Sequence, residues 1–281
     1  MTSAGTQDHT FELADGRTLA YLDLGEPGGR LVVSNHGGLS SRLDVLPADD
    51  AARAAGIRLI SPDRPGIGGS TRQPGRTLLD WPGDVAQLAD HLGAERFSLM
   101  GWSLGGPYAA ACAYALADRV ASLALIASPI PSTWADEGDH LNRMDRTLLE
   151  LSGRAALADR AVFTLMRAAA HRAPKAFAKQ SGATGDLATE LPAAVAEGLA
   201  DTAGVVDDYR VFGAPWGFEP SDLARPVRLW QGDADELVPP SWAGRLADAI
   251  PGAELTVVPG ASHFLWYDHW TEIFEQLALP T

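Results

Sequence analysis

The feature that most constrains the fold of this chain is an alternation of short apolar runs with amphipathic stretches, which begins at Leu31. The runs "LVVSN", "IRLIS" and "RFSLMG" are separated by the helical patterns "VLPADDAARAAG" and "LLDWPGDVAQLADHLG". Short runs rich in Val, Ile and Leu between helical patterns are typical of parallel strands with helices on both faces of the sheet. We therefore predict an α/β protein with a doubly wound, mostly parallel sheet.

The N-terminal segments follow a different pattern. The runs "TFELA" and "RTLAYLDL" flank the dipeptide Asp15-Gly16, which favours a tight hairpin turn. We therefore expect an antiparallel N-terminal edge on the parallel sheet.

The alternation stops after the run "VASLALIAS" and resumes only at "VRLWQGD". Between them, residues 130–222 contain helical patterns and turns but no clear strand. A helical insertion in such a sheet is best interpreted as a lid over the carboxyl ends of the strands, where ligands bind. We predict a core of residues 1–129 and 223–281 and a helical cap of residues 130–222.

Composition narrows the possible partners of this 281-residue chain. Its net charge of −14 argues against nucleic acid and anionic membranes as partners, because both prefer a basic face. Cys112 is the only cysteine, which excludes an intrachain disulfide and a cysteine-based metal cluster. The start "MTSAGTQDHT" has neither a basic nor an apolar segment of a signal peptide, so we expect a soluble cytoplasmic protein.

The segment "LMGWSLGGPYAA" contains the pattern G-x-S-x-G between an apolar run and an alanine-rich helical pattern. This is the arrangement of a nucleophile elbow, a tight strand-to-helix turn that exposes Ser103. A serine hydroxyl is a poor nucleophile near neutral pH unless a neighbouring imidazole accepts its proton and a carboxylate orients that imidazole. The loop "GDADELVPP" supplies Asp233 and Asp235 after one strand, and "GASH" supplies His263 after the next.

Together these motifs resemble the α/β-hydrolase superfamily, in the serine-nucleophile branch with a helical cap. The resemblance rests on "GWSLGG", "HGG", "DRPGIGGS", "GDADELVP" and "GASH", in this order. It implies Ser103 as nucleophile and His263 as general base and acid. The family pattern G-x-x-D-x-x-V-P selects Asp235 as the orienting carboxylate, where spacing alone leaves Asp233 open.

The resemblance also implies an oxyanion hole. The backbone N–H groups of Leu104 and Gly38 are the expected donors, with the N–H of Leu39 as the alternative to Gly38. His36 occupies a family position that is usually structural. We expect no cofactor and no metal, because the sequence contains no phosphate-binding loop, dinucleotide fingerprint or metal-ligand cluster.

The remaining site predictions concern four tryptophans. Trp102 flanks the nucleophile and is expected to border the substrate pocket, whereas core packing is an equal alternative for the other three. The four candidates are Trp102, Trp134, Trp216 and Trp266.

These features predict a serine hydrolase acting on a small to medium, largely apolar ester, lactone or related acyl compound. A serine at the elbow excludes the epoxide and halide chemistry of relatives that carry aspartate there. C–C bond hydrolysis, lyase or cyclase chemistry, a proline-iminopeptidase-like activity and a small-molecule receptor remain open, because one fold and site serve many functions. The sequence does not determine the oligomeric state.

Overall fold

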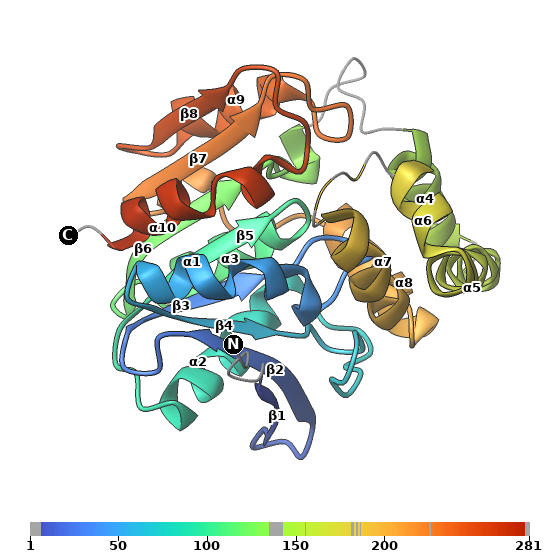
Figure 1. Cartoon of the computed structure of the whole chain (residues 1–281), viewed down its shortest axis with the longest axis horizontal. Coiled ribbons are helices and arrows are strands. Elements are labelled where there is room, and N and C mark those ends of the chain that lie inside the picture. Colours follow the sequence, from blue (N-terminus) through green and yellow to red (C-terminus); the bar gives the residue numbers. More distant parts are fainter. Residues whose placement is uncertain are drawn as a thin grey trace.

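The computed structural model describes residues 7–134, 143–154, 156–180, 183, 185, 187–224 and 226–278. These residues form an eight-stranded sheet with helices on both faces (Figure 1). The strands are β1 (Gln7–Glu12), β2 (Thr18–Gly25), β3 (Arg30–Asn35), β4 (Ile57–Pro62), β5 (Phe97–Trp102), β6 (Val120–Ile126), β7 (Val227–Gly232) and β8 (Glu254–Val258). The helices are α1 (Asp49–Ala54), α2 (Trp81–His91), α3 (Gly105–Ala115), α4 (Arg143–Arg154), α5 (Ala156–Arg172), α6 (Pro174–Gln180), α7 (Leu187–Gly198), α8 (Thr202–Gly213), α9 (Pro240–Ala249) and α10 (Trp270–Ala278).

The strand order is β1-β2-β4-β3-β5-β6-β7-β8. The strands β1, β2 and β4 pair antiparallel, and every later neighbour pair is parallel. The predicted hairpin turn lies at Gly16, whose φ of 82° suits a glycine. The predicted fold class, a mostly parallel sheet with an antiparallel N-terminal edge, is confirmed.

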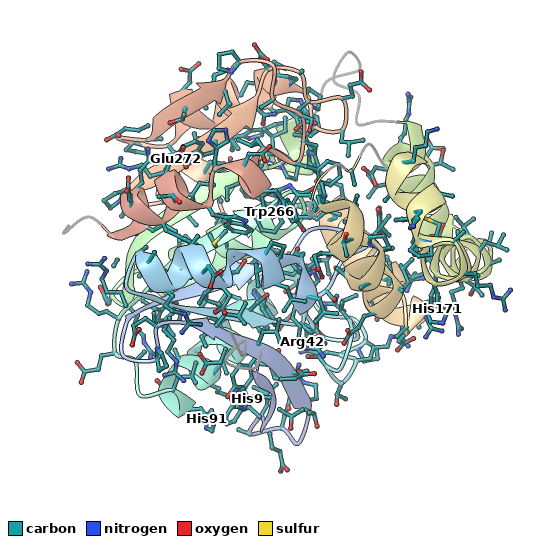
Figure 2. The ribbon with its side chains drawn as sticks, in the orientation of Figure 1. His9, Arg42, His91, His171, Trp266 and Glu272 are labelled. Carbon is teal, nitrogen blue, oxygen red and sulfur yellow. The ribbon has the colours of Figure 1, made fainter. Side chains whose placement is uncertain are left out.

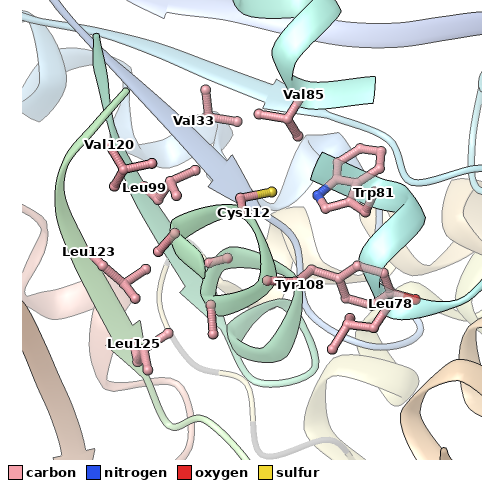
Figure 3. Packing of buried hydrophobic residues seen from close by; sticks show 14 of the residues in the cluster. Val33, Leu78, Trp81, Val85, Leu99, Tyr108, Cys112, Val120, Leu123 and Leu125 are labelled. Atoms are coloured by element: carbon pink, nitrogen blue, oxygen red, sulfur yellow. The ribbon is translucent and has the colours of Figure 1, made fainter. Parts of the chain in front are cut away.

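The strands β3 to β7 supply side chains to two apolar cores, because successive residues of a strand point to opposite faces of the sheet. Leu99 of β5 joins the core formed with α2, α3 and α9, and Met100 joins the core formed with α1 and α10. Figure 3 shows the first of these cores, where Cys112 of α3 lies among Val33, Val85 and Trp81. Cys112 is fully buried, and burial raises the pKa of its thiol well above the ordinary value.

Helices α4 to α8 form the segment between β6 and β7. Figure 1 shows α7 and α8 between the sheet and the outer helices α4 to α6. A Cβ added to Gly198 of α7 would meet the Ser40 carbonyl oxygen, and one added to Gly204 of α8 would meet the Gly66 carbonyl oxygen. These close backbone approaches fix α7 and α8 against the loops that follow β3 and β4.

Candidate active site

Ser103 lies in the turn between β5 and α3. Its φ of 53° is in the left-handed region, which non-glycine residues rarely adopt and which marks functional sites when the surroundings enforce it. The Ser103 N–H donates to the Ile126 carbonyl oxygen at 2.9 Å, and the Ser103 carbonyl accepts from the Gly106 N–H at 2.9 Å. The turn therefore holds the serine partly exposed at the end of the central strand.

The glycines around Ser103 permit a close approach of three backbone segments. A Cβ on Gly101 would meet the Gly105 carbonyl oxygen, and a Cβ on Gly105 would meet the carbonyl oxygens of Asn35 and His36. Since Asn35 ends β3, the start of α3 packs directly on the beginning of the loop "HGGLSSR".

His263 and Asp235 meet across two loops at the ends of β8 and β7. The distance from His263 Nδ1 to Asp235 Oδ2 is 2.8 Å, and both side chains are buried. Asp235 Oδ1 accepts hydrogen bonds from the backbone N–H groups of Leu237 at 2.8 Å and Val238 at 2.9 Å. Gln231 Nε2 donates to Asp235 Oδ2 at 3.0 Å.

These bonds favour the ionised carboxylate. Burial alone would raise the pKa of Asp235, but the hydrogen bonds from His263 and the backbone outweigh it and hold this pKa below its ordinary value. A carboxylate at Oδ2 places the imidazole proton on Nδ1, which leaves the lone pair of His263 Nε2 available as a base.

Asp233 has a different place in the structure. Its side chain is exposed, and its Oδ1 accepts a hydrogen bond from the Gly260 N–H at 2.6 Å. It therefore closes the loop that carries His263 without contacting the imidazole, which Asp235 contacts.

Trp102 connects the elbow to the histidine loop. Its indole Nε1 donates to the His263 carbonyl oxygen at 3.0 Å, and its ring lies 5.4 Å from the His263 ring. Among the described residues, no hydrogen bond joins the Ser103 hydroxyl to His263. Trp266, labelled in Figure 2, is fully buried and stacks on Trp102 at 4.7 Å.

The other two candidate tryptophans contact different parts of the molecule. Trp216 is buried in the core beside Phe218, with the ring centroids 5.5 Å apart. The Trp134 carbonyl accepts a hydrogen bond from Arg245 of α9 at 2.5 Å. Their role in a pocket stays a prediction.

The loop after β3 presents backbone donors in a fixed orientation. Arg64 donates to the carbonyl oxygens of His36 at 2.5 Å and Gly37 at 3.1 Å. In a trans peptide, the C=O of one residue and the N–H of the next point in opposite directions. The Gly37 N–H accordingly points away from Arg64 and donates to Asp44 Oδ2 at 3.1 Å, and the Gly38 N–H points away from the pinned Gly37 carbonyl.

The N–H groups expected to form the oxyanion hole donate no hydrogen bond within the described part of the protein. In the described part of the chain, neither the Gly38 N–H nor the Leu104 N–H has a hydrogen-bond acceptor. A Cβ on Gly38 would meet the Leu104 side chain, so the two residues are in contact. The Leu39 N–H likewise has no hydrogen-bond acceptor among the described residues, and Leu39 has a left-handed φ of 57°.

His36 supports this loop as a neutral imidazole. Its Nε2 accepts a hydrogen bond from the Arg64 N–H at 3.2 Å, so Nδ1 carries the proton and donates to the Gly37 carbonyl at 2.9 Å. Burial and the adjacent Arg64 guanidinium lower the pKa of His36 well below its ordinary value. Its environment therefore fits a structural role.

Asp44 supports the loop from the opposite side. Burial raises the pKa of Asp44 to about 7, although the Gly37 N–H and the nearby Arg64 favour its ionised form. Its second oxygen, Oδ1, is buried and has no hydrogen-bond partner among the described residues. The folded protein therefore keeps this carboxyl protonated at pH values below about 7.

Replacing Asp44 by Asn should flatten the dependence of stability on pH. The folded protein holds the Asp44 proton up to about pH 7, whereas the unfolded chain releases it near pH 4, so this group's contribution to stability falls as pH rises between these values. Between pH 5 and pH 8, wild type should lose about 2–3 kcal/mol more than the variant, measured by urea unfolding. Asp50→Asn, at an exposed position of α1, is the control. Equal pH dependence in wild type and Asp44→Asn would contradict the assignment.

Apolar side chains surround the Ser103 turn on the side of the inserted helices. Leu104 is buried in one cluster with Val206 and Tyr209 of α8 and Leu148 of α4, and the partly buried Phe264 packs against it. The described residues contain no group of three or more His, Cys, Asp or Glu placed to hold a metal ion. Nor does any described helix have the length and apolar character needed to cross a membrane.

The model of the α/β-hydrolase fold family matches residues 30–269. The chain therefore belongs to this family, and the predicted resemblance is confirmed. It is 39% identical over 114 residues to a dihydrolipoyllysine-residue acetyltransferase component of an acetoin cleaving system from Pseudomonas putida; the match covers 40% of this chain and 30% of that protein. The matches span less than half the length of such curated relatives.

Solved structures match over nearly the whole chain. A bromoperoxidase from Bacillus anthracis has a TM-score of 0.74 at 21% identity, covering 96% of this chain and 98% of that one. An enol-lactonase from Burkholderia xenovorans LB400 has a TM-score of 0.73 at 19% identity, covering 96% and 99%. At these identities the likeness shows the fold alone.

The buried polar residues that fix the loop after β3 were not predicted from the sequence. The loop "DRPGIGGS" contributes to the family resemblance, but no role was predicted for its Arg64, which makes the contacts to the loop after β3. Asp208, which pairs with Arg64 at 2.7 Å, is 144 residues away along the chain. An acidic pair in a helical pattern, "VVDDYR", was the only local sign of it.

Proposed function

We propose that this chain is a serine hydrolase of small to medium, largely apolar esters, lactones or related acyl compounds. The proposal is carried by two observations: the left-handed turn of Ser103 and the buried His263–Asp235 pair, with Trp102, the residue before Ser103, hydrogen-bonded to the His263 carbonyl oxygen. A serine with an imidazole and carboxylate pair is a combination that activates a hydroxyl nucleophile.

In the first half of the proposed reaction, Ser103 Oγ attacks the substrate carbonyl carbon while His263 Nε2 accepts the hydroxyl proton. Asp235 stabilises the imidazolium that forms and keeps the ring oriented. The tetrahedral intermediate collapses as His263 donates its proton to the leaving alcohol oxygen, which leaves an acyl group on Ser103. Water then attacks the acyl-enzyme with His263 as base, and the acid departs.

The oxyanion of each tetrahedral intermediate would be held by the N–H groups of Leu104 and Gly38. Gly38 is preferred over Leu39 because the pinned Gly37 carbonyl directs the Gly38 N–H away from Arg64, and because Gly38 contacts Leu104. Donors fixed before the reaction stabilise the developing charge without reorganisation.

The apolar surroundings support the proposed substrate class. We assign residues 130–222 as a cap over a core of residues 1–129 and 223–281, with the cap supplying much of the surface around the acyl group. Leu104 and the partly buried Leu39 and Phe264 form one apolar cluster with cap side chains, which favours an uncharged acyl chain because burying a charge is costly.

Hydrolysis of p-nitrophenyl butyrate tests the proposal. We expect many turnovers per enzyme molecule, and a loss of about 10⁴-fold or more in kcat for Ser103→Ala. Ser262→Ala removes an exposed serine beside His263 and should retain activity. Saturable binding of acyl compounds without turnover would instead favour a receptor, and turnover that survives in Ser103→Ala would reject the nucleophile.

A further inference from the structure

A cluster of buried charges joins helix α8 to the loop that carries Gly38. Asp208 of α8 accepts hydrogen bonds from Arg64 Nε at 3.0 Å and Nη2 at 2.7 Å, and from Arg76 Nη2 at 2.5 Å. The Tyr108 hydroxyl of α3 also donates to Asp208, at 2.9 Å. The side chains of Arg64 and Arg76 are each 1% exposed, so these groups interact without competition from bulk water.

Asp208 is the anionic partner that makes the burial of Arg64 tolerable. Although burial disfavours the carboxylate, the two guanidinium groups hold the pKa of Asp208 well below its usual range. The Arg64 guanidinium also lies over the Tyr108 ring, 4.6 Å from its centroid. Asp208 and Tyr108 therefore fix one side of the Arg64 guanidinium group.

The other side of the same guanidinium holds the peptide planes next to the proposed oxyanion hole. Arg64 Nη1 donates to the His36 carbonyl and Nη2 to the Gly37 carbonyl. Because a rigid planar fork makes both sets of contacts, a change in the orientation of Arg64 must alter the direction of the Gly38 N–H.

We infer that Asp208 is a positioning residue for the oxyanion hole, which it orients through Arg64. This inference rests on the proposed function, since it assigns Asp208 to the stabilisation of the transition state of that reaction. The position of α8 and the direction of the Gly38 N–H are thus coupled through Arg64. Asp208 itself contacts neither the substrate nor the reacting atoms.

The neighbouring Asp207 provides a matched control. It lies on the same helix, and its Oδ2 pairs with Arg72 Nε at 2.6 Å and lies 4.0 Å from Arg76 Nη1. Among the described residues, no hydrogen bond or ion pair joins Asp207 to Arg64. We expect Asp208→Asn to lower kcat about 10- to 100-fold with KM changed less than about threefold, since deleting an oxyanion donor outright costs about 10²–10³. The affinity for butylboronic acid, which forms a tetrahedral adduct on an active serine, should fall in parallel with kcat. Asp207→Asn should leave both values near wild type.

A second readout does not depend on activity. In spectra of the ¹⁵N-glycine-labelled protein, the Gly37 and Gly38 amide resonances should move in Asp208→Asn and stay in place in Asp207→Asn. If wild type hydrolyses no ester, the proposed function fails, and these resonances then decide only whether Asp208 orients the Gly37 and Gly38 peptide groups. Unmoved Gly37 and Gly38 resonances in a folded Asp208→Asn protein overturn the inference, as does an unchanged kcat in an active one.

Arg64→Lys covers the case in which Asp208→Asn does not fold. A lysine keeps the buried cation opposite Asp208 but lacks the planar fork that reaches both carbonyl oxygens. It should reproduce the lower kcat, the weaker boronic acid binding and the moved glycine resonances. A folded Arg64→Lys protein with all three at wild-type values overturns the inference.

Discussion

Replacing Asp235 by Asn should lower kcat about 10⁴-fold, which corresponds to roughly 5.5 kcal/mol of barrier. The reason lies in the two backbone N–H groups of Leu237 and Val238, which donate to Oδ1. They force the Asn carbonyl oxygen into that position, so the Asn amide group must face His263. An amide N–H donates to His263 Nδ1 and leaves the proton on Nε2, where the base should be. The measurement is kcat for p-nitrophenyl butyrate, after circular dichroism confirms the fold.

Asp233→Asn is the matched control for this prediction. Asp233 accepts one hydrogen bond from the Gly260 N–H, which an Asn carbonyl can also accept, so its kcat should stay within a few-fold of wild type. If Asp233→Asn strongly lowered kcat while Asp235→Asn left it near the wild-type value, Asp233 would be the orienting carboxylate and the assignment of Asp235 would be refuted.

Gly105→Ala should destabilise the protein by about 2 kcal/mol or more and reduce turnover strongly. The added methyl group would meet the carbonyl oxygens of Asn35 and His36, which are backbone atoms that cannot rotate away. Either α3 or the end of β3 must then shift. A shift of α3 displaces the turn of Ser103, and a shift at the end of β3 displaces the loop that contains Gly38. Urea unfolding and kcat measure the two effects.

Gly83→Ala is the control, because it makes the same chemical change in helix α2 with open space around the new methyl group. It should stabilise the protein by about 0.5–1 kcal/mol through the higher helix propensity of alanine, and leave kcat unchanged. If Gly105→Ala behaved like Gly83→Ala, the close approach at the elbow would be wrong.

The strands and the elbow could be predicted from the sequence because their signals are local. The alternation from Leu31 and the glycines around Ser103 lie within short windows, and the period of the pattern reports which face is buried. The choice between Asp233 and Asp235 needed a family pattern, since both stand at a strand end and only the loop fold decides which reaches His263.

Contacts between distant segments could not be predicted in this way. Nothing in the composition of α8 pairs Asp208 with Arg64, and nothing near Asp44 indicates that its carboxyl lies under the Gly37 N–H. Tryptophan positions were equally undetermined, because a large apolar ring fits a core as well as a pocket. Trp102 lies against His263, whereas Trp216 packs on Phe218.

The central claim, that Ser103 is the activated nucleophile, is tested most directly by covalent labelling. A fluorophosphonate probe should add one equivalent to the intact protein, abolish ester hydrolysis in proportion, and appear on the peptide that contains Ser103. His263→Ala should slow this labelling strongly, because the hydroxyl loses its base. Labelling of another residue with Ser103 unmodified, or labelling that proceeds as fast in His263→Ala as in wild type, would contradict the account.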